Sequence, residues 1–308
     1  MPDRSYSDSL PPLSDSEEVL RRRLEQHVWT LADAIGERNI WHDRELEAAA
    51  GYIEKVWRDL GYETKRQKFV VDNVTVANLE AERVGTSLQE EIVVVGAHYD
   101  SVIGSPGAND NASGVAALLE IARLFVQETP SRTVRFVAFV NEEPPFFQTE
   151  AMGSRHYAAR SRQCREPIVA MLSLETIGYY SEEKGSQRYP FPLRLFYPDT
   201  AHFIGFVANI SSRHLLHRVM AAFRSHTDFP SEGVAAPGWM TGIGWSDHWS
   251  FWQEGYPAIM VTDTALFRYA PYHTLEDTSD KIDYARMARV VTGITRVVAE
   301  LAGTDTGS

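Results

Sequence analysis

The sequence holds a single cysteine, Cys164, in 308 residues. One thiol cannot form an internal disulfide, so no disulfide framework stabilises this fold. Long apolar stretches are absent too, and without a run of about 18 apolar residues we expect no transmembrane segment. Residues 1–15 are rich in Ser, Asp and Pro and lack the apolar centre of a signal peptide. We therefore expect a cytoplasmic protein.

Basic residues are in deficit. Thirty Lys and Arg stand against 42 Asp and Glu, which gives a formal net charge of −12. Such a chain repels phosphate backbones, so we expect no nucleic-acid partner. The composition, with 44% hydrophobic and 23% charged residues, is that of an ordinary globular protein. It excludes a disordered, collagen-like or coiled-coil chain.

The hydrophobic pattern alternates along the chain between helical and strand-like spacing. In residues 17–35, apolar side chains recur three and four positions apart behind Ser14, which predicts a capped helix. The apolar run EIVVVG at 91–96 is typical of a strand covered on both faces. Strands are predicted at 63–71, 73–82, 91–96, 133–140, 168–174, 193–197 and 258–262, and helices at 17–35, 44–60, 112–128, 150–162, 213–226 and 284–301.

Alternating strands and helices predict an α/β protein, a three-layer αβα sandwich around a central mixed, mostly parallel sheet. The sequence has no internal repeat and no linker long enough to divide it. We expect a flexible N-terminal tail over 1–15, a single domain over 16–303 and a C-terminal tail over 304–308. In such sheets the active site lies beyond the carboxyl ends of the strands.

Acidic residues and a histidine stand where three predicted strands end. His98 follows the strand 91–96, Glu142 and Glu143 follow 133–140, and Glu175 follows 168–174. Two neighbouring acids are usually a solvated pair, but behind a buried strand they are costly to place without a cation or proton. Asp110 lies between glycines just before a predicted helix, where it could be an N-cap or present its carboxylate to a site.

These residue types indicate a metal site. A histidine at a strand end is usually structural, but Asp100, two residues after His98, could hold the second imidazole nitrogen of a ligand. Imidazole and carboxylate ligands without thiolates exclude a cysteine-rich structural zinc site. Together these residues are similar to those of a dinuclear zinc hydrolase, in which a free glutamate lies beside two metal ions.

Seven short motifs occur in the order found in one known family. They are GAHYDS (96–101), ANDNASG (108–114), NEE (141–143), MGS (152–154), LETIG (174–178), SDH (246–248) and YHT (272–274). In these motifs the sequence resembles the co-catalytic zinc exopeptidases, which include bacterial leucyl aminopeptidases, aminopeptidase Y, glutamate carboxypeptidases and glutaminyl cyclases. The resemblance covers about residues 40–300.

The resemblance implies two zinc ions and a role for each motif residue. His98 and Glu175 would bind one zinc, Glu143 and His273 would bind the other, and Asp110 would bridge them. Many family members have Asp at the position of Glu175. Glu142 would be the unligated general base, which takes a proton from a metal-bound water and delivers it to the leaving amine. The resemblance also implies a cis peptide bond between Asp110 and Asn111.

Other residues near the last motifs have open interpretations. Asp247 could orient a ligand or cap a following helix. Trp245, Tyr269 and Tyr272 lie in a stretch rich in aromatics and glycines that could line a pocket for an apolar side chain. Arg268 is one conceivable anchor for a substrate carboxylate.

The expected function is a zinc-dependent exopeptidase that acts on a peptide or small aminoacyl substrate, most simply an aminopeptidase. A glutaminyl cyclase-like acyltransferase, a carboxypeptidase and a non-catalytic receptor-like module remain alternatives. The presence of Glu142 argues against the last of these.

Overall fold

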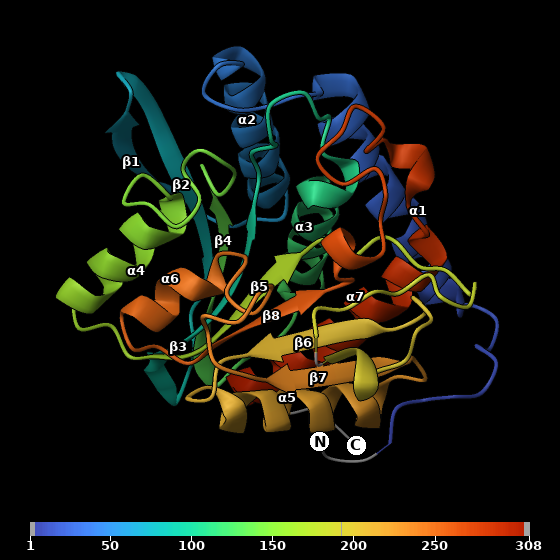
Figure 1. Cartoon of the computed structure of the whole chain (residues 1–308). Coiled ribbons are helices and arrows are strands. Elements are labelled where there is room, and N and C mark those ends of the chain that lie inside the picture. Colours follow the sequence, from blue (N-terminus) through green and yellow to red (C-terminus); the bar gives the residue numbers. More distant parts are fainter. Residues whose placement is uncertain (1–3, 192, 305–308) are drawn as a thin grey trace.

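The computed structural model describes residues 4–191 and 193–304. In this part of the chain eight strands form one sheet in the order β1-β2-β4-β3-β5-β8-β6-β7 (Figure 1). The strands are β1 (Thr64–Val71), β2 (Val74–Arg83), β3 (Leu88–His98), β4 (Arg132–Phe139), β5 (Ile168–Glu175), β6 (Ile204–Ala208), β7 (Ser231–Ala235) and β8 (Ala258–Thr262).

The middle of the sheet is parallel. β4, β3, β5 and β8 are parallel neighbours, whereas β1 and β2, β2 and β4, and β6 and β8 pair antiparallel. The predicted mixed, mostly parallel sheet is therefore confirmed. Because four neighbouring strands run the same way, their carboxyl ends lie along one edge and bring the following loops together.

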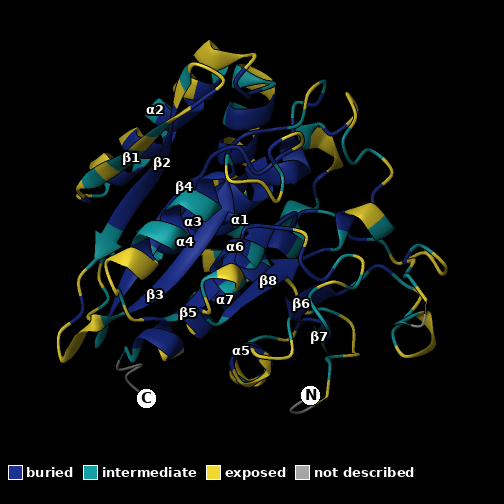
Figure 2. Cartoon of the chain, turned by 60° about the vertical axis from the view of Figure 1, so that its left-hand side comes forward, coloured by how far each residue is buried: buried dark blue, intermediate teal, exposed yellow. Residues whose placement is uncertain are grey.

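Helices cover both faces of the sheet. They are α1 (Asp15–Trp29), α2 (Asp43–Asp59), α3 (Gly114–Phe125), α4 (Gly153–Gln163), α5 (Arg213–His226), α6 (His248–Gln253) and α7 (Tyr284–Ala302). Alternate residues of β3 point to opposite faces. Val93 and Val95 join the core beneath α1, α2, α3, α5 and α7, while Ile92 and Val94 pack with residues of α4 and α6. The predicted three-layer sandwich is confirmed, and the central strands are its most buried part (Figure 2).

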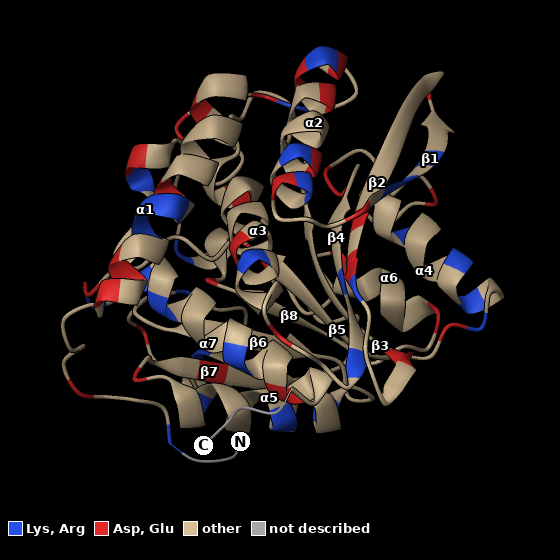
Figure 3. Cartoon of the chain, turned by 180° about the vertical axis from the view of Figure 1, so that it is seen from behind, with Lys and Arg blue, Asp and Glu red and all other residues tan. Residues whose placement is uncertain are grey.

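The first helix begins where the sequence predicts. The Ser14 side chain accepts a hydrogen bond from the Glu17 amide, and Glu17 in turn accepts from the Ser14 amide, which closes a capping box. α1 continues through a π-helical turn at Thr30–Ile35. Most charged residues of α1 and α2 lie on the outer surface (Figure 3), whereas Glu54 of α2 is buried. No helix in the described part of the chain is long and apolar enough to cross a membrane.

The predicted strand at 193–197 is wrong. Residues Leu193–Leu195 form a short 3₁₀ helix, and Leu195 and Phe196 are 65% and 75% exposed. The sequence analysis missed β6 and β7, each only five residues long. Apolar periodicity reports a strand only when the segment finds a partner in a sheet, and the 193–197 segment has none.

The other predicted helices and strands are confirmed with small differences at their ends. In the expected N-terminal tail, residues 4–14 form no helix or strand. Residues 1–3 of that segment, and 305–308 of the expected C-terminal tail, lie outside the described residues.

Candidate metal centre and adjoining pocket

The strand ends bring the predicted acids and histidines to one place. His98 is the last residue of β3, Glu175 is the last of β5, and Glu142 and Glu143 follow β4. Two loops contribute the remaining residues. Asp110 comes from the turn before α3, and His273 comes from the loop after β8.

One half of the centre is built around His98, which is completely buried. Its Nε2 atom lies 3.3 Å from Asp110 Oδ1 and 3.3 Å from Glu175 Oε2. Glu142 Oε2 is farther away, at 3.9 Å from the same nitrogen. Glu142 is therefore beside this group of three residues.

The other half is built around His273. Its Nε2 atom lies 3.0 Å from Asp110 Oδ2 and 3.1 Å from Glu143 Oε2. Asp110 thus directs one carboxylate oxygen at each histidine. The peptide bond from Asp110 to Asn111 is cis, as the resemblance implied.

The donor atoms fit a cation. His98 Nε2, Asp110 Oδ1, Glu143 Oε1 and His273 Nε2 are buried and have no hydrogen-bond partner among the described residues. His98, Asp110 and Glu143 each offer a ligand atom within 4.8 Å of the others. Imidazole nitrogen and carboxylate oxygen are ligands that zinc accepts. This group could therefore hold a metal ion.

Burial and neighbouring charges strongly shift the pKa values of the acids and histidines at this centre. Burial, together with the charge of Asp110, raises the pKa of Glu143 to about 8. Burial also raises the pKa of Glu142 well above its ordinary value, and Glu175 and Glu143 reinforce the shift. Burial lowers the pKa of His273, but Asp110 and Glu143 outweigh it and raise the value to about 10. Burial at this centre thus favours the protonated forms of Glu142 and Glu143 unless a cation compensates their charge.

Asp100 holds the two glutamates after β4. Its Oδ1 accepts the Glu142 amide N–H and its Oδ2 accepts the Glu143 amide N–H, both at 3.2 Å. His98 Nδ1 lies 3.3 Å from the Asp100 carbonyl oxygen and 3.5 Å from Oδ1. Asp100 therefore contacts both sides of the centre, whereas the sequence indicated only the contact with His98.

Asp247 is fully buried at the N-cap position of α6, but its side chain makes no capping hydrogen bond. Neither carboxylate oxygen has a hydrogen-bond partner among the described residues. Burial, with Glu175 and Asp100 nearby, raises the pKa of Asp247 to about 7. The capping interpretation is therefore wrong, and the expected orienting role is not borne out either, because Asp247 makes no hydrogen bond to a candidate ligand. The residue that contacts a candidate ligand is its neighbour Ser246, whose hydroxyl donates to Glu175 Oε2 at 2.7 Å.

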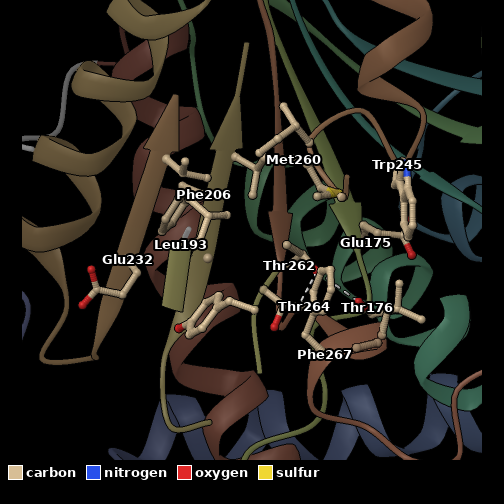
Figure 4. Close-up of a pocket in the computed structure, with 18 of the residues that line it drawn as sticks. Glu175, Thr176, Leu193, Phe206, Glu232, Trp245, Met260, Thr262, Thr264 and Phe267 are labelled. Carbon is tan, nitrogen blue, oxygen red and sulfur yellow. Dashed lines mark hydrogen bonds between the residues drawn. The ribbon is translucent and has the colours of Figure 1, made fainter. Parts of the chain in front are cut away.

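An apolar pocket opens beside the centre. Trp245, Leu266, Tyr272 and Glu175 border both the pocket and the space in front of Asp110 and Glu142. The pocket extends over β6, β7 and β8, and its empty volume, which includes space open to the solvent, is about 820 Å³. Figure 4 shows Trp245 and Glu175 at one side, Met260 and Thr262 in the middle, and Phe206 and Leu193 opposite.

Two residues expected near the substrate lie elsewhere. Tyr269 is 3% exposed, and its hydroxyl donates to Asp277 Oδ1 at 2.8 Å, so it does not line the pocket. Arg268 is 8% exposed and donates to Gln187 Oε1 and the Phe203 carbonyl. The prediction that Tyr269 and Arg268 lie near the substrate is therefore wrong, because both side chains have structural roles. Trp245 and Tyr272 do border the pocket.

The sequence analysis missed several buried residues that hydrogen-bond to the backbone and side chains next to the candidate ligands. Asp277 and Asp263 are fully buried acids that hydrogen-bond to Asn109 beside Asp110. Arg38, also fully buried, donates to the carbonyl oxygens of Tyr99 and Gly107. Asp277 and Arg38 lie in polar segments whose local pattern predicts solvent exposure. Asp263 follows β8, where the rule of acids at strand ends could have found it.

The sequence profile described as Peptidase family M28 matches residues 76–298. The chain belongs to this family. YfbL of Escherichia coli K12 is 38% identical over 281 residues, covering 88% of this chain and 85% of that protein. A probable aminopeptidase of Saccharomyces cerevisiae, YDR415C, is 25% identical over 231 residues. That alignment covers 70% of this chain but 55% of the yeast protein, so this chain spans about half of its length.

Solved structures share the fold of this chain. A zinc aminopeptidase from Bacillus subtilis superposes with a TM-score of 0.72 at 18% identity, covering 93% of this chain and 95% of that one. A glutaminyl cyclase from Fimbriiglobus ruber gives 0.68 at 20% identity, covering 95% and 97%. Family membership assigns this chain to a peptidase family, and several relatives are described as probable zinc metalloproteases. The resemblance drawn from the motifs is confirmed.

Proposed function

We propose that this M28 protein is an aminopeptidase that uses two zinc ions to hydrolyse the N-terminal bond of a peptide or small aminoacyl substrate. The observation that carries the proposal is the position of Asp110, 3.3 Å from His98 Nε2 through one oxygen and 3.0 Å from His273 Nε2 through the other. A carboxylate shared in this way suits a ligand that bridges two metals. His98 and Glu175 would complete one zinc site, and Glu143 and His273 the other.

Charge balance supports two ions rather than one. The centre and its supporting residues include eight buried acids, namely Asp100, Asp110, Glu142, Glu143, Glu175, Asp247, Asp263 and Asp277. Among the described residues, two buried arginines, Arg38 and Arg268, lie close enough to offset them. Buried charge of one sign must be compensated by counter-charge or protons. Two divalent cations compensate this excess more completely than one.

Glu142 is the proposed general base. Bound zinc would polarise the scissile carbonyl and lower the pKa of a water molecule. Glu142 lies beside the ligand atoms, and Asp100 holds its backbone N–H. A carboxylate fixed there can accept the proton of the water and pass it to the departing amine.

The charge of the pocket favours a substrate's N-terminus over its C-terminus. Glu175 and Glu232 are the charged residues among the described lining of the apolar pocket, and that lining includes no Lys or Arg. A carboxypeptidase needs a cation to bind the substrate carboxylate, and Arg268 is buried beside Gln187 and Phe203 and does not line the pocket. An acidic centre beside an apolar pocket suits an α-ammonium group and an apolar first side chain.

Metal analysis combined with a substrate panel tests the proposal. We expect close to two zinc ions per chain and hydrolysis of aminoacyl-anilides with apolar residues, abolished by chelator and restored by zinc. N-terminal glutaminyl peptides and peptides blocked at the N-terminus serve as comparisons. Cyclisation of the glutaminyl peptide without anilide hydrolysis would assign the acyltransferase alternative. Release of C-terminal residues would assign a carboxypeptidase, and no turnover with metal bound would favour a receptor-like module.

A further inference from the structure

The loop that carries His273 also carries a buried acid with no part in the proposed chemistry. Asp277, four residues after His273, is completely buried. Its Oδ1 accepts the Asn109 amide N–H at 2.8 Å, and its Oδ2 accepts the Asp110 amide N–H at 3.1 Å. The Tyr269 hydroxyl also donates to Oδ1, at 2.8 Å.

These contacts join the two segments that meet at the centre. Tyr269 precedes His273 by four residues and Asp277 follows it by four, so their hydrogen bond closes the loop around His273. The same carboxylate accepts a hydrogen bond from the backbone N–H of Asp110. The distance between the Asp110 carboxylate and the His273 imidazole is thus set through one side chain that binds both segments.

A second buried acid completes the support of the Asp110 segment. Asp263 Oδ2 accepts the Asn109 side-chain N–H at 2.9 Å and the Tyr179 amide N–H at 2.8 Å. Asn109 Oδ1 in turn accepts the Gly178 amide N–H at 2.9 Å. Asp263, at the start of the loop after β8, therefore ties Asn109 to the segment after β5. Asp277 ties Asn109 and Asp110 to the part of that loop around His273.

We propose that Asp277 is a positioning residue that fixes Asp110 and His273 at the spacing a shared metal requires. This inference rests on the proposed function, because it assigns both residues as ligands. Outer contacts of this kind orient metal ligands and commonly change metal affinity by about 10- to 100-fold when removed.

The test replaces Asp277 with Asn and measures the zinc dissociation constant by competition with a chelating dye. Asn retains the shape, but one acceptor oxygen becomes an N–H donor. Whichever way the amide turns, a donor then faces a backbone N–H. We expect a dissociation constant raised by about tenfold or more for at least one zinc, together with a changed visible spectrum of the cobalt-substituted protein.

Two control variants separate positioning from general stability. Asp280→Asn removes a carboxylate that is exposed on the same loop. Leu216→Ala creates a cavity under α5, away from the centre, and lowers stability without touching the loop. Both controls should bind zinc with the wild-type dissociation constant. Asp277→Asn could fail to fold, and Tyr269→Phe is the second variant for that case. It removes the hydrogen bond from the Tyr269 hydroxyl to Asp277 Oδ1 and should weaken zinc binding by a few-fold.

The outcomes are distinct. Wild-type protein that binds no zinc would overturn the proposed function itself. Wild-type protein that binds zinc, with Asp277→Asn binding it equally well, would overturn the positioning role. Weakening to the same extent in Leu216→Ala would also overturn it, because loss of stability would then explain the effect. If only Tyr269→Phe can be studied, an unchanged dissociation constant decides against the role.

Discussion

The Ser246 hydroxyl donates a 2.7 Å hydrogen bond to Glu175 Oε2, the oxygen that also lies 3.3 Å from His98 Nε2. Ser173 Oγ lies 2.9 Å from Ser246 Oγ. Because Ser246 gives its proton to the carboxylate, Ser173 must donate to Ser246. The two hydroxyls therefore present a fixed donor to a buried acid and hold it toward His98.

Replacing Ser246 with Ala should weaken zinc binding at the His98 side of the centre. Glu175 would lose the donor that orients it, and we expect the zinc dissociation constant of one site to rise by about tenfold. Isothermal titration of zinc into protein stripped of metal by a chelator would measure the dissociation constants of both sites. Ser225→Ala, on α5, removes a hydroxyl bonded to a helix carbonyl and should change neither site. Equal weakening of both sites would argue against a specific role for Ser246.

Replacing Glu142 with Gln should abolish turnover and leave zinc content and folding nearly unchanged. The amide cannot accept a proton at neutral pH, and general-base roles contribute about 10²–10⁴-fold to the rate. Replacing Glu143 with Gln should instead lower zinc content together with activity, because it removes a ligand. Steady-state kinetics and metal analysis on both variants provide the comparison. If Glu142→Gln loses zinc and Glu143→Gln retains it, then Glu142 is the ligand and Glu143 the general base.

Zinc binding to the metal-free protein should release protons. The pKa of His273 is raised to about 10 by Asp110 and Glu143, and that of Glu143 is raised to about 8 by burial and Asp110. At pH 7 the pair of His273 and Glu143 therefore carries at least one proton that zinc must displace. Apparent affinity should therefore rise with pH, by about tenfold per pH unit for each proton released. Calorimetry in buffers of different ionisation enthalpy counts the protons, and a count of zero at pH 7 contradicts the prediction.

Filling the apolar pocket should change which residues are removed. Val207 lies on β6 and lines the pocket with Met260 of the neighbouring strand. Val207→Phe should lower kcat/KM for leucyl- and phenylalanyl-anilides by about tenfold or more, and affect alanyl-anilide much less. Val70→Phe, at an exposed position on β1, is the matched control. A uniform loss for all three substrates would indicate a damaged centre rather than a filled pocket.

Away from the centre, Glu120 should make the protein sensitive to acid. This fully buried acid of α3 receives hydrogen bonds from His27, Arg23 and Arg123. Burial raises its pKa, but these partners outweigh burial and lower it to about 2. A lowered folded-state pKa stabilises the protein above the unfolded value of 4.5, and the stabilisation is lost as pH falls toward 2.

Glu120→Gln should therefore lower the free energy of unfolding at pH 7 by up to about 3 kcal/mol. It should also flatten the dependence on pH between 5 and 3. Urea denaturation across this range measures both effects. Parallel pH profiles for the variant and the wild type would show that another group carries the acid sensitivity.

The sequence by itself determined the family, the layer order and the residues of the centre. Buried parallel strands are apolar to their ends, so a His or an acid at such an end stands out from its neighbours, as His98, Glu143 and Glu175 do. In the described part of the chain, local periodicity also located every α-helix except the six-residue α6, because an amphipathic helix must repeat its pattern whatever it packs against.

Tertiary structure alone decided what surrounds that centre. Leu193–Leu195 has a strand-like composition but no partner, while five-residue β6 is a strand because β7 and β8 pair with it. Nothing near Asp277 in the sequence marks it as different from exposed Asp280. It is buried because the loop after β8 folds back onto the segment of Asn109 and Asp110, 167 residues away in the chain. Burial and hydrogen-bond partners are set by contacts between distant segments, which local patterns do not encode.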